Sequence, residues 1–122
     1  QRRSFKKTVG PGLWESSVAG HIGPEDNYFT GAVREVKEET GIAIDPKDLK
    51  LHKIYKDHDR KEFIGVFYHQ VDIDKDNIKM EEDEVEEVKL IDKKTLKNYI
   101  VYKKSNSWIT YGYEKEIFAL LD

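Results

Sequence analysis

Cysteine is absent from this 122-residue sequence, and so are long apolar runs. Without cysteine the chain has no disulfide framework, no thiol nucleophile and no thiolate metal site. No apolar run approaches the roughly 20 residues that a membrane-spanning helix needs, so we expect no membrane partner. A cytoplasmic setting is the simpler expectation, although a chain without cysteine suits any compartment.

The net charge is also small, at −3, which argues against general nucleic-acid binding. The charges are nevertheless unevenly placed. Residues 80–87 carry six acids and no base, whereas residues 1–7 carry no acid and the four bases Arg2, Arg3, Lys6 and Lys7. This basic cluster would suit contact with phosphate, but a solvated basic stretch is an equally good interpretation.

Length and composition indicate one domain over residues 1–122, large enough to bury a core. Apolar patterning predicts strands over residues 13–19, 49–55, 62–73 and 85–90, with the aromatic and β-branched 62–73 segment in a central position. Helices are expected over residues 93–100 and near the C-terminus, where the apolar stripe is Tyr113, Ile117, Leu120 and Leu121. The alternation predicts an α/β layered sandwich with a mixed β-sheet.

The firmest local prediction is a helix between Asn27 and Gly41. Asparagine is a good N-cap, and glycine is a good residue just past a helix end. Gly31 lies inside this helix, where glycine is about 1 kcal/mol less favourable than alanine, and the sequence does not explain it. The stripe that we expect to be buried recurs at helical spacing and consists of Phe29, Ala32, Val33 and Val36.

The same helix carries three carboxylates on little more than one turn, at Glu35, Glu38 and Glu39. Residues three and four apart share a helix face, and like charges so placed repel each other by a few tenths of a kcal/mol per pair. A bound divalent cation would offset that repulsion, because hard cations prefer carboxylate and carbonyl oxygens. An ordinary surface helix with its acids in water is the simpler alternative.

The helix lies within residues 20–42, which resemble the signature of the Nudix hydrolases, G-x5-E-x7-R-E-U-x-E-E-x-G-U, where U is a bulky aliphatic residue. Asp26 replaces the first glutamate, and the matching positions are Gly20, Arg34, Glu35, Val36, Glu38, Glu39, Gly41 and Ile42. The resemblance implies an α/β/α sandwich and Mg²⁺- or Mn²⁺-dependent hydrolysis of a diphosphate linkage, in a nucleoside diphosphate derivative or a related metabolite. The partner would be a small-molecule diphosphate, and the sequence permits a homodimer.

The resemblance also implies a ligand set. Glu35 and Glu39 would be the primary metal ligands, with Glu38 next in line, and the backbone carbonyl of Ala19 would be a further ligand. Hydrolysis would then proceed by attack of a water activated by a glutamate of this helix or by an acid from the loop before residue 85. Glu84 is our candidate for that acid, with Glu81 and Glu82 behind it, while a solvated acidic loop is the alternative.

Two other signature positions have supporting roles. Arg34 lies four residues before Glu38, which suits an ion pair along the helix, and in the family this arginine orients the metal-binding glutamates. A routine surface salt bridge would be the alternative for Arg34. Asp26 would either contact the metal through a water or help Asn27 to cap the helix.

Two rival functions follow from the same resemblance. Asp26 is the one feature that favours a binding module that keeps the fold without catalysis. His21 occupies a variable position of the hydrolase signature but resembles a metal-binding histidine of isopentenyl-diphosphate isomerase, whose catalytic cysteine would fall at Ala19.

The start of the chain is the last feature that the resemblance interprets. Family domains carry a strand, often two, well before the signature, and residues 1–3 look like the end of one. We therefore expect the chain to lack the first strand or strands of the sandwich.

Overall fold

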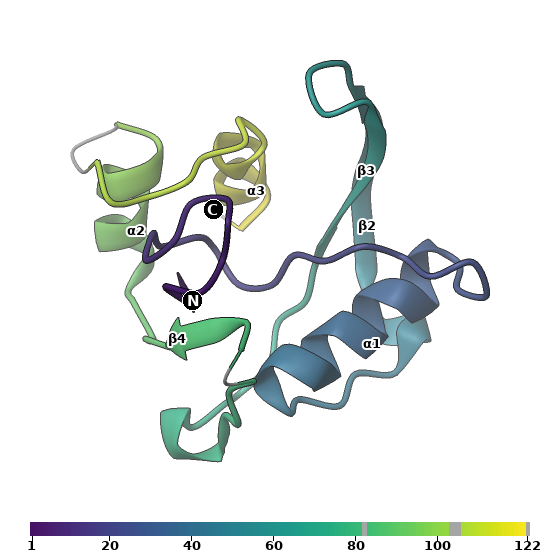
Figure 1. The fold of residues 1–122 in the computed structure, drawn as a ribbon, viewed down its shortest axis with the longest axis horizontal. Helices are drawn as coiled ribbons and strands as arrows, with labels where there is room; N and C mark the ends of the chain where they lie inside the picture. The colour runs from purple at the N-terminus through teal and green to yellow at the C-terminus, as the bar shows by residue number, and fades with distance from the viewer. Residues whose placement is uncertain (82, 103–105, 122) are drawn as a thin grey trace.

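The computed structural model describes residues 1–81, 83–102 and 106–121, and Figure 1 shows the order of their elements. Helices and strands both contribute, which confirms an α/β protein. The strands are β1 (Arg2–Arg3), β2 (Lys50–Asp57), β3 (Glu62–Tyr68) and β4 (Val85–Glu87). The α-helices are α1 (Tyr28–Thr40), α2 (Lys93–Ile100) and α3 (Glu114–Leu121), and short 3-10 helices span Pro46–Asp48 and Lys75–Asn77.

The strands form two antiparallel pairs. β1 pairs with β4, and β2 pairs with β3 through the turn at residues 58–61. Two isolated bridges extend the first pair, because Arg2 pairs with Trp14 in antiparallel fashion and Trp14 pairs with Trp108 in parallel fashion. The pairings around Trp14 therefore combine both directions, as a mixed sheet requires.

Three predicted strands are shorter in the structure than in the sequence analysis, each because its partner ends. The predicted strand over residues 13–19 is reduced to the bridges of Trp14. The predicted strand over residues 85–90 stops at Glu87, since β1 offers only two residues to pair with. The predicted strand over residues 62–73 stops at Tyr68, which pairs with the first residue of β2. Among the described strands β3 pairs with β2 alone, so the predicted central position was wrong.

Both ends of α1 are fixed as the sequence predicts. The Asn27 side chain accepts a hydrogen bond from the Thr30 N–H at 2.9 Å, and the Thr30 hydroxyl accepts one from the Asn27 N–H at 2.9 Å. Gly41 adopts φ 77°, a conformation that favours glycine, and its N–H donates to the Lys37 carbonyl. These caps set the direction in which the acidic last turn of α1 points.

The burial of α1 differs from the prediction. The expected stripe is only half-buried, and the buried positions are Gly31, Glu39 and Thr40. The helix contacts β3 near its start, where Phe29 meets Phe67 edge to face at 5.0 Å between ring centroids. A Cβ at position 31 would lie 2.5 Å from the Ile22 Cγ2, so the loop before the helix packs directly on Gly31. This close approach explains a glycine that the sequence left unexplained.

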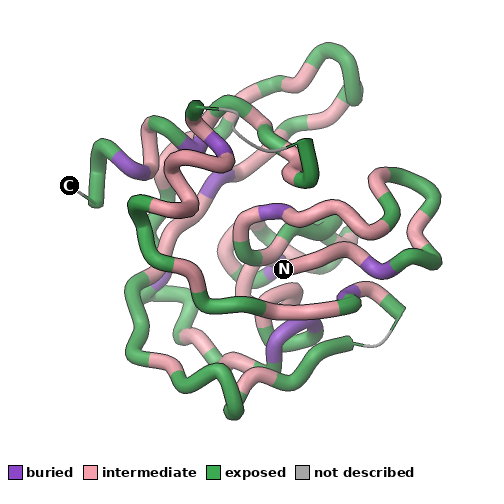
Figure 2. The backbone as a smooth tube through the Cα atoms, turned by 90° about the vertical axis from the view of Figure 1, so that its left-hand side faces the viewer, coloured by how far each residue is buried: buried purple, intermediate pink, exposed green. Residues whose placement is uncertain are grey.

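The other two helices, α2 and α3, pack against each other. In the view of Figure 1 they lie above the β1–β4 pair and away from α1. Phe118 is the buried apolar residue of α3, whereas the predicted stripe residues Leu120 and Leu121 are about half exposed. Trp108 stacks between Trp14 and Tyr99, at 5.9 Å from each ring, and so ties this side to the sheet. Figure 2 shows that the buried stretches are short and separate. Within the described ranges no helix combines the length and the apolar character needed to cross a membrane.

Candidate metal centre

The three carboxylates at the end of α1 differ in burial. Glu38 is exposed, Glu35 is half-buried and Glu39 is only 5% exposed. The Glu39 Oε2 is buried without a hydrogen-bond partner. Burial first, and then the negative charges of Glu35, Glu15 and Glu84, raise the pKa of the Glu39 carboxyl to about 8. A buried carboxylate oxygen in such surroundings is a position at which a cation would be favourable.

Arg34 contacts two of the three carboxylates of the acidic ridge, by which we mean Glu35, Glu38 and Glu39. Its guanidinium lies 3.1 Å from a Glu35 oxygen and 3.2 Å from a Glu38 oxygen, so the predicted pair with Glu38 is present. It also donates to the His21 carbonyl at 3.2 Å. These contacts leave Glu39 as the ridge residue that Arg34 does not contact, and they fix the other two carboxylates.

Asp26 contacts Arg34, an arrangement that neither of our two interpretations included. Its Oδ2 lies 2.9 Å from the Arg34 Nε, and this hydrogen bond is the largest contribution that raises the pKa of Arg34. Asn27 caps α1 without help from the Asp26 side chain. The pair spans eight residues and crosses from a loop to a helix, so no local spacing rule could have indicated it.

The loop before α1 approaches the ridge at Gly20. A Cβ at this position would overlap the Glu35 carboxylate, so a larger residue here would displace that side chain. Ala19, whose carbonyl the sequence analysis assigns to the metal, directly precedes this contact and is exposed. The close approach thus brings the loop backbone and a ridge carboxylate together.

Substituting Gly20 by alanine should therefore displace Glu35. We expect Gly20→Ala to weaken Mn²⁺ binding by about tenfold or more, as is typical when a ligand's support is disturbed, with little change in unfolding free energy. Isothermal titration calorimetry with Mn²⁺ measures the first quantity and urea unfolding the second. Gly23→Ala is the matched control, since a Cβ there meets only Asp26 Oδ2, at 3.4 Å. Equal Mn²⁺ affinity in both variants would contradict the proposed contact.

The acidic loop and the basic cluster meet each other. Glu84, the predicted loop acid, forms an ion pair with Lys7, and its charge is one of those that raise the pKa of Glu39. Arg2 donates to the Gly12 carbonyl at 2.9 Å and lies 3.9 Å from Glu87. The structure therefore brings Glu84 toward the ridge, while the basic residues pair with the protein's own groups.

The other predicted residues contribute less. Glu81 is exposed, and Glu82 lies outside the described residues. The His21 side chain is 93% exposed and lies 3.4 Å from Glu62 of β3, at the hairpin. The His21 side chain is therefore paired with Glu62, and the His21 carbonyl accepts a hydrogen bond from Arg34.

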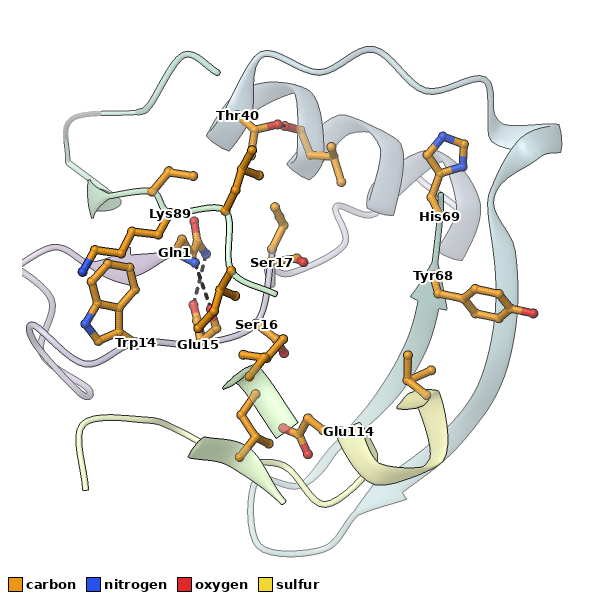
Figure 3. A pocket seen from close by; sticks show the side chains of 18 of the residues that line it. Gln1, Trp14, Glu15, Ser16, Ser17, Thr40, Tyr68, His69, Lys89 and Glu114 are labelled. Carbon is orange, nitrogen blue, oxygen red and sulfur yellow. Dashed lines mark hydrogen bonds between the residues drawn. The ribbon is translucent and has the colours of Figure 1, made fainter. Parts of the chain in front are cut away.

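Glu15 was missed by the sequence analysis. Its side chain is 2% exposed, and its carboxylate accepts hydrogen bonds from Gln1, Arg3 and Tyr111 at 3.1, 3.2 and 3.0 Å. Figure 3 shows the Gln1–Glu15 contact at the polar side of a cavity of about 850 Å³. Most of the remaining cavity wall is apolar, and Thr40, next to Glu39, also lines it. Glu15 follows Trp14 with no neighbouring acid, so no pattern in the sequence indicates its role.

The donors present fit a hard divalent cation in part. Within the described ranges no three Asp, Glu or His side chains gather closely enough to form a metal site by themselves. Mg²⁺, however, usually takes one or two carboxylates and completes its shell with waters and substrate phosphate oxygens. The unpaired Glu39 oxygen, the nearby Glu35 carboxylate and the adjacent loop backbone supply that smaller set.

The chain is similar to known proteins over most of its length. A family model described as the NUDIX domain matches residues 1–111. The uncharacterized Nudix hydrolase lin0387 of Listeria innocua is 27% identical over 120 residues, 98% of this chain and 68% of that protein. Nudix hydrolase 3 of Arabidopsis thaliana is 44% identical over 55 residues, 45% of this chain and 7% of that protein.

A partial match has a different activity in its name. Isopentenyl-diphosphate Delta-isomerase of Kocuria rhizophila is 35% identical over 43 residues, 35% of this chain and 24% of that protein. No solved structure matches the chain.

Proposed function

This chain belongs to the NUDIX domain family, and on that basis we propose that it is a hydrolase that cleaves a diphosphate linkage. Its substrate would be a nucleoside diphosphate derivative or a related metabolite, and its cofactor Mg²⁺ or Mn²⁺. The proposal extends what the family and the relatives named Nudix hydrolases support, which is a hydrolase that acts on small molecules. We further propose that the elements form an α/β/α sandwich with a mixed sheet, for which the parallel bridge at Trp14 is the support.

One observation carries the assignment of the site. Glu39 is 5% exposed, and one of its oxygens has no hydrogen-bond partner. A buried carboxylate oxygen without a donor is unfavourable by roughly 1–3 kcal/mol unless a cation or a water satisfies it. Arg34 contacts Glu35 and Glu38, and the hydrogen bond from Gln1 to Glu39 leaves this Glu39 oxygen without a partner, so a metal ion would be a suitable partner for it.

The residues divide into three roles. Glu35, Glu39 and the Ala19 carbonyl would hold the cation, with Glu38 beside them. A bound Mg²⁺ or Mn²⁺ would neutralise the diphosphate charge, polarise the phosphorus and make a nearby water more acidic. Glu38 or Glu84 would accept the proton of the attacking water. Arg34 would act through the carboxylates that it orients, and Asp26 fixes the direction of Arg34.

The test is a hydrolysis screen across nucleoside diphosphate derivatives and related diphosphates with Mg²⁺ or Mn²⁺. We expect phosphate or nucleotide release from at least one member, and loss of that release in the presence of EDTA. Chromatography of the products identifies which bond breaks. Binding without turnover on every member would instead favour a module that senses its ligand.

The isomerase alternative has less support. The name of the Kocuria rhizophila relative suggests it, but that match covers 35% of this chain. The chain has alanine at position 19, where the resemblance would need a cysteine, and it contains no cysteine at all. His21 is exposed and paired with Glu62. Conversion of isopentenyl diphosphate to its isomer without loss of phosphate would be the result that favours this alternative.

A further inference from the structure

Glu15 is buried far more completely than a surface salt bridge would require. Its carboxylate takes hydrogen bonds from three side chains that are 14, 12 and 96 residues away: Gln1, Arg3 and Tyr111. The backbone adds two bonds, because the N–H of Glu15 donates to the Gln1 carbonyl at 2.9 Å and the terminal nitrogen of Gln1 donates to the Glu15 carbonyl at 2.9 Å. One residue thus joins the start of the described chain to the turn before α3.

A buried carboxylate at position 15 is not needed for the stability of the fold alone. Bringing a charge out of water costs several kcal/mol, and well-packed apolar residues of similar volume often replace buried ion pairs without loss of stability. The neighbouring Trp14, Trp108 and Tyr99 already provide an apolar contact between the same segments. A buried charged network is therefore expected to set a geometry that apolar packing would leave loose.

The position of Glu15 in the chain indicates which geometry that is. Trp14 and Glu15 carry the last paired backbone groups before a segment without regular secondary structure, which runs to the start of α1. Five residues later, Gly20 lies against the Glu35 carboxylate. The loop with the Ala19 carbonyl is therefore held at two points, by the Glu15 network at its start and by the Gly20–Glu35 contact at its end.

We propose that Glu15 is a positioning residue of the metal centre: its hydrogen bonds to Gln1, Arg3 and Tyr111 fix the 15–20 segment so that the Ala19 carbonyl faces Glu35 and Glu39. This inference rests on the proposed metal-dependent function. It assigns Glu15 no contact with the ion or the substrate, and its effect is transmitted through the backbone of five residues.

Glu116 offers a matched control. Its carboxylate accepts hydrogen bonds from the Lys53 ammonium at 2.9 and 3.1 Å and lies 3.0 Å from the His52 Nε2. These contacts join α3 to β2, and they involve neither the 15–20 segment nor any of the three donors to Glu15. Glu15 and Glu116 are therefore both carboxylates that join distant segments through hydrogen bonds, and only the first is placed to act on the metal centre.

The experiment measures Mn²⁺ affinity by electron paramagnetic resonance of free Mn²⁺, with urea unfolding to establish that each variant is folded under the titration conditions. We expect Glu15→Gln to weaken Mn²⁺ binding by about 10- to 100-fold, as removal of an outer support of a ligand typically does. Tyr111→Phe removes a single donor to Glu15 and should weaken binding by a smaller factor, with the fold kept. Glu116→Gln should lose stability and keep the Mn²⁺ affinity of the unaltered protein.

The outcomes separate this inference from the proposed function. If the unaltered protein binds Mn²⁺, Glu39→Gln loses it and Glu15→Gln or Tyr111→Phe keeps it, the metal centre stands and the role of Glu15 is wrong. Equal losses of affinity in Glu15→Gln and Glu116→Gln would also overturn it, because they would reflect general destabilisation. If Glu15→Gln does not fold, Tyr111→Phe decides alone. Absence of Mn²⁺ binding by the unaltered protein would overturn the proposed function and this inference together.

Discussion

Replacing Glu39 by glutamine should lower metal-dependent turnover by about a thousandfold or more and leave the fold intact. Stabilisation of transition-state charge by a bound cation contributes several kcal/mol, and each 1.4 kcal/mol corresponds to a factor of ten in rate. Glutamine has the shape of glutamate without its charge, so Glu39→Gln would weaken the hold on the cation. Because the Glu39 side chain is buried with one oxygen unpaired, the neutral amide fits the same space.

The measurement is product release with Mg²⁺ or Mn²⁺ on the best substrate of the screen, together with circular dichroism and urea unfolding. Glu86→Gln is the control, since Glu86 is an exposed acid of β4 outside the proposed site. We expect Glu86→Gln to keep normal turnover. Near-normal turnover in folded Glu39→Gln would instead remove Glu39 from the catalytic centre.

The metal-free protein should lose stability as the pH rises from about 4.5 to about 8. The Glu39 carboxyl has a pKa of about 8 when folded, against an ordinary value of 4.5, because burial and neighbouring acids disfavour its charge. Below pH 4.5 both the folded and unfolded states hold the proton, so Glu39 has no effect on stability there. Between the two values the unfolded state releases its proton first, and the folded state becomes progressively less favourable. Above pH 8 the Glu39 carboxyl is ionised in both states, so its effect on the free energy of unfolding grows no further.

The expected loss is on the order of a few kcal/mol, after allowance for screening by residual solvent. Urea unfolding in EDTA at pH 5 and pH 8 measures it. Glu39→Gln should flatten the dependence and make the protein more stable at pH 8, since glutamine carries no charge to bury. Glu86→Gln should keep the dependence of the unaltered protein. Parallel pH profiles for Glu39→Gln and the unaltered protein would show that Glu39 is not the residue responsible.

Helix-capping and helix-spacing rules predicted the features that depend on residues within one helical turn of each other. The bounds of α1 follow from Asn27 and Gly41, whose caps act within one helical turn. The helix over residues 93–100 and the pairing of Arg34 with Glu38 depend on spacings of three and four residues in the same way. Strand lengths were less predictable, because a strand continues only as far as its partner does, and the partner of Tyr68 is the first residue of β2.

The sequence by itself determined the acidic helix, its ends and the family signature, because these depend on residue order and on contacts within a turn. Only the tertiary structure decided that Ile22 packs against Gly31 and that the Glu35 side chain lies against Gly20. It also decided that Asp26 forms an ion pair with Arg34. It also decided that Glu15 is buried between residues up to 96 positions away. Such contacts depend on how distant segments pack, and a side chain's burial and charge environment follow from that packing and not from its neighbours in the chain.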